Sequence, residues 1–81
     1  MKVRTLFFSV LRDVTNTDAT IMEAAAGATV ADLLEQVFAQ WPGLKAWDAN
    51  LLMAVDQTYV KRDAPLHENA EVALMPPVQG G

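Results

Sequence analysis

The sequence contains no cysteine and only one histidine among its 81 residues. Without cysteine it has no disulfide, no thiol nucleophile and no thiolate metal site, and such a fold suits a reducing compartment. His67 lies in a polar stretch beside Glu68. A single histidine without a nearby base or second ligand is typical of a solvated loop residue. Glycine-rich phosphate loops and paired-histidine spacings are also missing. We therefore expect no bound metal and no conventional catalytic constellation.

Basic residues are also few. Six lysines and arginines face ten acidic residues, which gives a net charge of −4 and a pI of about 4.6. This balance disfavours nucleic acid and anionic membranes as partners. No apolar run reaches membrane-spanning length, and the first residues lack a signal-peptide core. A chain of 81 residues with 52% hydrophobic content fits one folded domain. We expect a small acidic domain in the cytoplasm.

Hydrophobic periodicity predicts an α+β fold. Alternating or continuous apolar stretches predict strands over residues 2–8, 19–24, 51–55, 59–60 and 71–75. Thr29 and Asp32 have the spacing of a capping box and start the main helix, which Pro42 and Gly43 end. Ser9 is expected to cap a short helix over residues 10–14. Together these elements predict one main helix packed on one face of a four- or five-stranded sheet.

The first strand carries apolar bulk on both of its sides. If Val3 and Phe7 pack against the helix, alternation puts Leu6 and Phe8 on the opposite face of the sheet. Met75 of the last strand lies on that face by the same reasoning, and Tyr59 is expected to join it. A single helix cannot cover both faces. The uncovered apolar patch predicts docking to another protein.

The C-terminal segment is the most distinctive stretch of the chain. Two prolines end regular structure because a prolyl nitrogen cannot donate to a strand ladder. The residues that follow end in two glycines with no Cβ and a free carboxylate, so the tip is thin enough to enter a narrow channel. We expect a folded domain over residues 1–76 and an extended, flexible tail over residues 77–81 that reaches roughly 15 Å. The tail residues are Pro77, Val78, Gln79, Gly80 and Gly81. An ordinary frayed terminus is the alternative.

The order of these elements and the ending over residues 71–81 resemble the small, sulfur-carrier subunit of molybdopterin synthase. Residues 6–8, 52–57 and 65–66 also carry this resemblance, which covers the whole chain. The resemblance implies a ubiquitin-like β-grasp fold with a mixed sheet. Asn69 stands near the position where the family often has a Gly-Asp turn, and asparagine can also adopt the left-handed conformation.

The resemblance also implies a mechanism. An activating enzyme that uses ATP and magnesium would adenylate the carboxylate of Gly81, and a sulfur donor would convert it to a thiocarboxylate. The tail would then donate its sulfur to cyclic pyranopterin monophosphate in the large synthase subunit. Phe8, Tyr59, Met75 and Leu6 would form the docking patch. The implied assembly contains two small and two large subunits, and the large subunits would supply the catalytic side chains. No stably bound cofactor is expected on the small subunit.

Three other functions fit the same residues. The chain could carry sulfur for another pathway, such as thiamin biosynthesis, which the Pro-Pro-Val stretch disfavours. It could be a protein modifier that is joined to lysines through Gly81. It could also be a binding module whose tail is inert. Branched conjugates would identify a modifier, and an inert tail could be deleted without effect.

Overall fold

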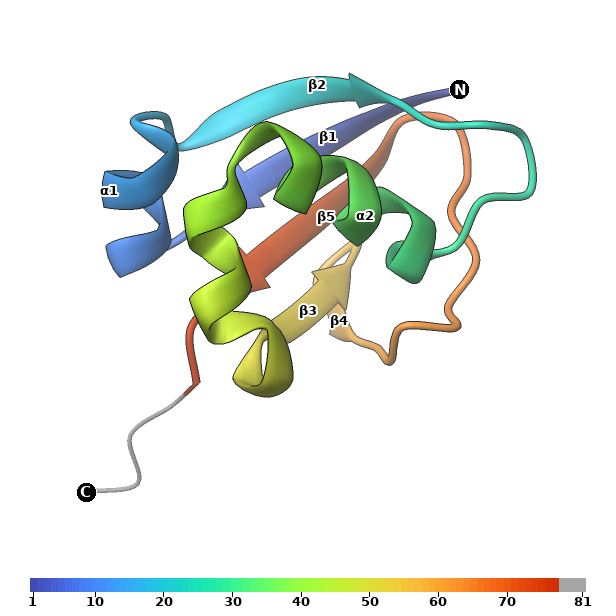
Figure 1. Ribbon diagram of the computed structural model, residues 1–81. Coiled ribbons are helices and arrows are strands. Elements are labelled where there is room, and N and C mark those ends of the chain that lie inside the picture. The colour runs from blue at the N-terminus through green and yellow to red at the C-terminus, as the bar shows by residue number, and fades with distance from the viewer. Residues whose placement is uncertain (78–81) are drawn as a thin grey trace.

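The computed structural model describes residues 1–77. In chain order these residues form β1 (Lys2–Phe7), α1 (Val10–Thr15), β2 (Ala19–Glu23), α2 (Val30–Gln40), a 3₁₀ segment (Pro42–Asn50), β3 (Leu52–Val55), β4 (Thr58–Tyr59) and β5 (Ala70–Met75). The strands form one five-stranded sheet in the order β2-β1-β5-β3-β4. Strands β1 and β5 are parallel, and the other neighbouring pairs are antiparallel. Helix α2 lies across one face of this mixed sheet (Figure 1), so the predicted α+β architecture is confirmed.

The register of the central strands separates two faces. Val3 and Phe7 of β1 point to the α2 side and are almost completely buried. In the parallel pairing with β5, Phe7 lies opposite Leu74, and Val72 lies one pleat further back on the same side. These residues belong to a single core cluster with the buried residues of α2. The expected packing of Val3 and Phe7 on the helix side is therefore confirmed, and Val72 and Leu74 join them in the core.

Helix α2 begins at the predicted capping box. The Thr29 hydroxyl accepts the Asp32 amide at 3.4 Å, and the Asp32 carboxylate accepts the Thr29 amide at 2.9 Å. Apolar spacing along the helix gives one core-facing stripe. The buried members of this stripe are Val30, Leu33, Leu34, Val37 and Phe38. Trp41 follows the helix and packs edge-on against Phe7, with ring centroids 5.1 Å apart. Pro42 then starts the 3₁₀ segment.

The predicted cap of the short helix is wrong. Helix α1 begins after Ser9, but the Ser9 side chain makes no capping hydrogen bond. Its φ of 56° is left-handed, whereas a capping serine normally has an extended backbone that aims its hydroxyl at the first turn. Thr15 stabilises the other end instead, since its hydroxyl can donate its single proton to the Thr17 carbonyl at 2.8 Å or to the Leu11 carbonyl at 3.2 Å.

Helix length also bears on membrane insertion. Within residues 1–77, the helices are too short and too polar for any of them to cross a bilayer.

Candidate docking face and C-terminal segment

Strand pairing brings residues from four strands into one row on the face opposite α2. Leu6 of β1 pairs with Ala73 of β5, Ala73 pairs with Ala54 of β3, and Ala54 pairs with Tyr59 of β4. Leu6 alternates with the buried residues of its strand, so its side chain lies on the other face. The row is therefore continuous from β1 to the β4 edge.

A second row lies at the end of the sheet where β5 finishes. Met75 of β5 pairs with Leu52 of β3. Phe8 directly follows β1, and its amide donates to the Leu74 carbonyl at 3.1 Å, which sets Phe8 beside the end of β5. The structure thus brings together the four residues that the sequence selected as a docking patch. We call the surface formed by Leu6, Phe8, Leu52, Tyr59, Ala73 and Met75 the open face.

Large apolar groups on the open face reach solvent. Tyr59 is 69% exposed and Phe8 is 44% exposed, whereas Leu6 and Met75 are half-buried. A cavity of about 350 Å³ beside Tyr59 is lined by Leu51, Leu52, Met53, Tyr59 and Val60. Exposed aromatic groups next to an apolar hollow are typical of surfaces that bind other proteins. The open face can accept an apolar surface of a partner.

The C-terminal segment begins at the same end of the sheet. Strand β5 ends at Met75, and the half-buried Pro76 and Pro77 follow it directly. Pro77 therefore lies near the second row of the open face, at the opposite end of the sheet from Met1 (Figure 1). The predicted tail residues Val78, Gln79, Gly80 and Gly81 lie outside the described residues.

Charged groups occupy the opposite end of the sheet. Arg4 of β1 lies 3.6 Å from Glu71 of β5. The Glu71 amide donates to Oδ1 of Asp56 at 3.1 Å, and the other oxygen of Asp56 lies 2.5 Å from Nε2 of His67. Nδ1 of His67 lies 2.9 Å from the Glu68 carbonyl oxygen. His67 is an exposed loop residue, as predicted, but the β3–β4 turn also brings Asp56 beside it, a contact that the sequence did not suggest.

These contacts shift two pKa values in opposite directions. The Glu71 amide and then His67 lower the pKa of Asp56, because both stabilise its carboxylate. The hydrogen bond to Asp56 and then the Glu68 carbonyl raise the pKa of His67, because both favour the imidazolium. Both side chains are at least half exposed, so solvent screens their attraction.

The remaining charged residues form no metal site. Within residues 1–77, no group of three or more histidine or acidic side chains is close enough to hold a metal ion.

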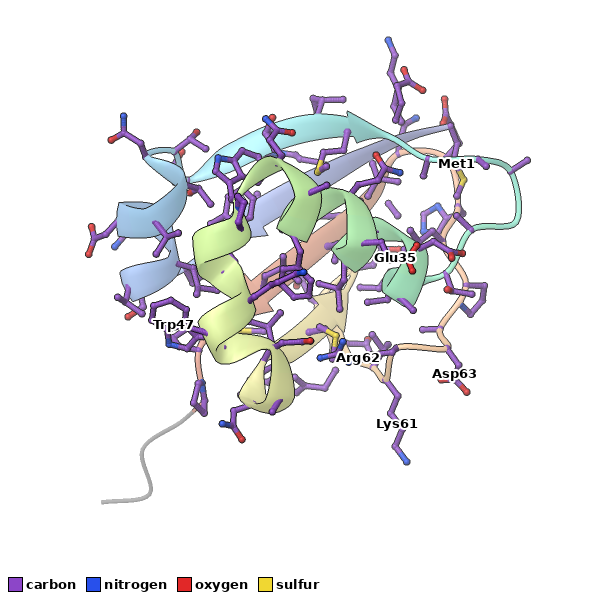
Figure 2. All side chains as sticks on the ribbon, in the orientation of Figure 1. Met1, Glu35, Trp47, Lys61, Arg62 and Asp63 are labelled. Atoms are coloured by element: carbon purple, nitrogen blue, oxygen red, sulfur yellow. The ribbon has the colours of Figure 1, made fainter. Side chains whose placement is uncertain are left out.

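The neighbouring basic residues Lys61 and Arg62 point in different directions. Figure 2 shows Lys61 extending away from the fold, while Arg62 turns back toward the 3₁₀ segment. Arg62 lies 2.7 Å from the Asp48 carboxylate. Its ion pair ties the loop after β4 to the 3₁₀ segment.

A mixed sheet of this strand order, with one helix across one face and a C-terminal segment that continues from the central strand β5, defines a ubiquitin-like β-grasp protein. Residues 5–81 match the family model of the ThiS family, and the chain belongs to that family. The resemblance to sulfur-carrier subunits is confirmed by a relative from Escherichia coli (strain K12), the molybdopterin synthase sulfur carrier subunit. It is 42% identical over 83 residues, which cover 98% of this chain and 99% of the relative.

Solved structures agree with this fold. The putative molybdopterin converting factor, subunit 1, from Pyrococcus furiosus is 29% identical and superposes with a TM-score of 0.87 over 96% of this chain and 99% of its own. A complex of subunits 1 and 2 of molybdopterin-converting factor from Helicobacter pylori 26695 contains a chain that is 23% identical, with a TM-score of 0.73 over 100% of both chains. At that identity the similarity concerns the fold alone.

Proposed function

We propose that this chain is the sulfur carrier subunit of a molybdopterin synthase and that Gly81 carries the sulfur as a thiocarboxylate. The observation that carries this proposal is the position of β5. This strand contributes Met75 to the open face and leads within two residues to the tail that ends in Gly80 and Gly81. One docking event would therefore bring the terminus to a partner. The identity of 42% to a named sulfur carrier subunit supports the same function.

The proposed chemistry starts at the terminal carboxylate. A carboxylate is a poor electrophile, so an activating enzyme would let a Gly81 oxygen attack the α-phosphorus of magnesium-bound ATP. Pyrophosphate would leave, and the product would be an acyl adenylate. Sulfide sulfur delivered by a donor would then attack the Gly81 carbonyl carbon, and AMP would leave. The resulting thiocarboxylate is a sulfur nucleophile that needs no cysteine, which fits a chain without cysteine.

The tail would next deliver its sulfur to cyclic pyranopterin monophosphate in the large subunit. The titratable pair among the described residues lies far from the start of the tail. Asp56 and His67 lie at the start of β5, because Asp56 contacts Glu71. The tail leaves after Met75, four residues further on, which is about 13 Å along the strand. The catalytic side chains would therefore belong to the partner, and the role of this chain would be docking and presentation.

The open face is the proposed site for the large subunit. Its apolar rows end where Pro77 leaves the sheet, so a partner that covers them would lie next to the tail. The Escherichia coli relative is named as a subunit of molybdopterin synthase, which supports a large-subunit partner for this chain. An arrangement with two small and two large subunits belongs to the same proposal, as does a separate activating enzyme that would use the open face in turn.

The test is an intact-mass measurement on the chain purified with a free C-terminus. It would be incubated with activating enzyme, ATP and a sulfur donor. The expected result is a mass gain equal to the difference between sulfur and oxygen, localised to Gly81. A variant extended by one residue beyond Gly81 is the matched control and should show no gain. No gain in the unmodified chain, with an activating enzyme that adenylates another carrier, would refute the proposal.

A second assay separates the sulfur pathways. The thiocarboxylate form would be mixed with a molybdopterin synthase large subunit and cyclic pyranopterin monophosphate, and dithiolene formation would be followed. Formation supports the molybdenum cofactor pathway. Charging without transfer to this substrate would assign the chain to another pathway. Branched conjugates on lysines would identify a modifier instead.

A further inference from the structure

We propose that His67 and Asp56 form a proton-dependent clasp that positions the β3–β4 hairpin, and with it Tyr59, on the open face. The clasp concerns the free chain and can be measured there. Only its effect on partner binding rests on the function proposed above.

The hairpin has few other attachments. Strand β4 is only two residues long and pairs with β3 at two positions. The turn before it contains Asp56 with φ 50° and Gln57 with φ 71°. Two consecutive left-handed residues match the requirement of a type I′ turn, but residues other than glycine or asparagine hold this conformation at some cost. Contacts made by the Asp56 side chain therefore add to the few that hold the hairpin in place.

The Asp56 carboxylate joins the turn to two other segments. One oxygen accepts the amide of Glu71 in β5, and the other contacts His67 in the loop before β5. The backbone adds to this anchor, because the Asp56 amide donates to the Glu71 carbonyl at 2.8 Å. Asp56 thus connects the end of β3, the start of β5 and the preceding loop.

The imidazole of His67 lies between two hydrogen-bond acceptors. Nε2 faces the Asp56 carboxylate at 2.5 Å, and Nδ1 faces the Glu68 carbonyl at 2.9 Å. A neutral imidazole has one N–H donor, whereas the imidazolium has two. Only the protonated ring can satisfy both contacts. Loss of the proton would leave one of the two oxygen atoms without its donor and would loosen the clasp.

Other charged groups nearby have their own partners. The Glu68 carboxylate accepts the Lys2 amide at 2.6 Å, and Glu71 lies 3.6 Å from Arg4. Asp56 is therefore the carboxylate that directly contacts the ring. The lowered pKa of Asp56 keeps its carboxylate charged to a lower pH than in an ordinary aspartate, and the raised pKa of His67 keeps its ring charged to a higher pH than in an ordinary histidine. The clasp is complete between the pKa values of these two groups and opens as the pH rises through the pKa of His67.

Opening would act on Tyr59 through the hairpin. Tyr59 lies two residues after the turn and pairs with Ala54 on the open face. The amide of Val60, which donates to the Met53 carbonyl at 3.0 Å, reports whether β4 is paired. Exposed ion pairs have small effects, so a change of about two- to fivefold in hairpin opening is expected.

The test uses the complete chain and nuclear magnetic resonance. Titration of the ring carbons should give a pKa for His67 above its ordinary value, and Asp56→Asn should bring it back toward that value. The hydrogen-exchange protection factor of Val60 should fall about two- to fivefold between about pH 5.5 and about pH 8. In His67→Gln, which cannot titrate in this range, the protection factor should be constant. An ordinary pKa for His67, or a pH-dependent change in Val60 that persists in His67→Gln, would overturn the clasp.

Partner binding tests the positioning role separately. The affinity for the large subunit should weaken about two- to fivefold over the same pH range, and this change should be smaller with His67→Gln. Thr58→Ser, which keeps the titrating pair, is the matched control and should retain the pH dependence. Equal pH dependence in His67→Gln and the unmodified chain would overturn the positioning role. Failure of sulfur charging would refute the carrier function without changing the titration of His67.

Discussion

Replacing Thr5 with valine should stabilise the protein. Thr5 is 0% exposed and lies on the α2 side of β1, between Thr20 of β2 and Val72 of β5. Its hydroxyl has no hydrogen-bond partner within residues 1–77. An unpaired buried hydroxyl costs about 1–3 kcal/mol, because it loses its bonds to water without replacement. Valine has nearly the same shape and favours strands. We expect Thr5→Val to raise the free energy of unfolding by about 1–3 kcal/mol.

Equilibrium urea denaturation would measure this change, with the slope checked for constancy. For a domain of this size, each kcal/mol corresponds to about 4–8 °C in the melting temperature. Thr15→Val is the matched control. The Thr15 hydroxyl is also buried but has acceptors for its proton in the carbonyl oxygens of Thr17 and Leu11, so its removal should destabilise the chain by about 1–3 kcal/mol. An unchanged or lower stability for Thr5→Val would mean that its hydroxyl is satisfied in solution, and the reasoning would fail.

The remaining predictions concern the helix and the open face. Thr29→Ala removes the cap of α2 and should cost about 1 kcal/mol in urea denaturation, and an unchanged stability would contradict the capping contribution. Leu34→Ala removes a fully buried core side chain and should cost about 2–5 kcal/mol in the same assay; a smaller loss would argue against tight packing there. Phe8→Arg and Met75→Arg should each weaken large-subunit binding by more than about 1 kcal/mol in calorimetry. Gln36→Arg, on the exposed side of α2, should leave that affinity unchanged. If Phe8→Arg and Met75→Arg bind the large subunit as tightly as Gln36→Arg does, the docking site lies elsewhere.

Local patterns were sufficient to predict much of the fold. The capping box and apolar spacing of α2 depend on residues within a few positions of one another, so the sequence reveals them directly. Strand alternation likewise predicted the two sides of β1. The order of the strands in the sheet has no local signal, because each paired residue of β1 lies 67 positions before its partner in β5, as Val3 does before Ala70. The left-handed backbone of Ser9 also has no local signal in the sequence, because a serine before a helix normally indicates a cap with an extended backbone. Asn69 at φ 65° was recognisable, because asparagine tolerates that conformation.

Local patterns also predicted part of the candidate site, whereas a contact between distant residues was missed. The positions of Leu6 and Met75 followed from alternation within single strands, and the structure puts both on one face. Their docking role stays a prediction. The contact between His67 and Asp56 was missed although strands were predicted on both sides of the turn that contains Asp56. The contact joins this turn to a loop 11 residues later, and no local pattern in the sequence signals it.

The central position of β5 has a mechanical consequence. This strand leads to the tail, yet it is held on one side by β1 and on the other by β3. A partner that pulls on the terminus would load both rows of interstrand hydrogen bonds along their length, so many bonds would resist the force together. An edge strand under the same load could peel away one bond at a time. Because β5 is central, both neighbouring strands resist tension that an enzyme applies to the tail. The domain therefore resists unfolding better than it would if the tail followed an edge strand.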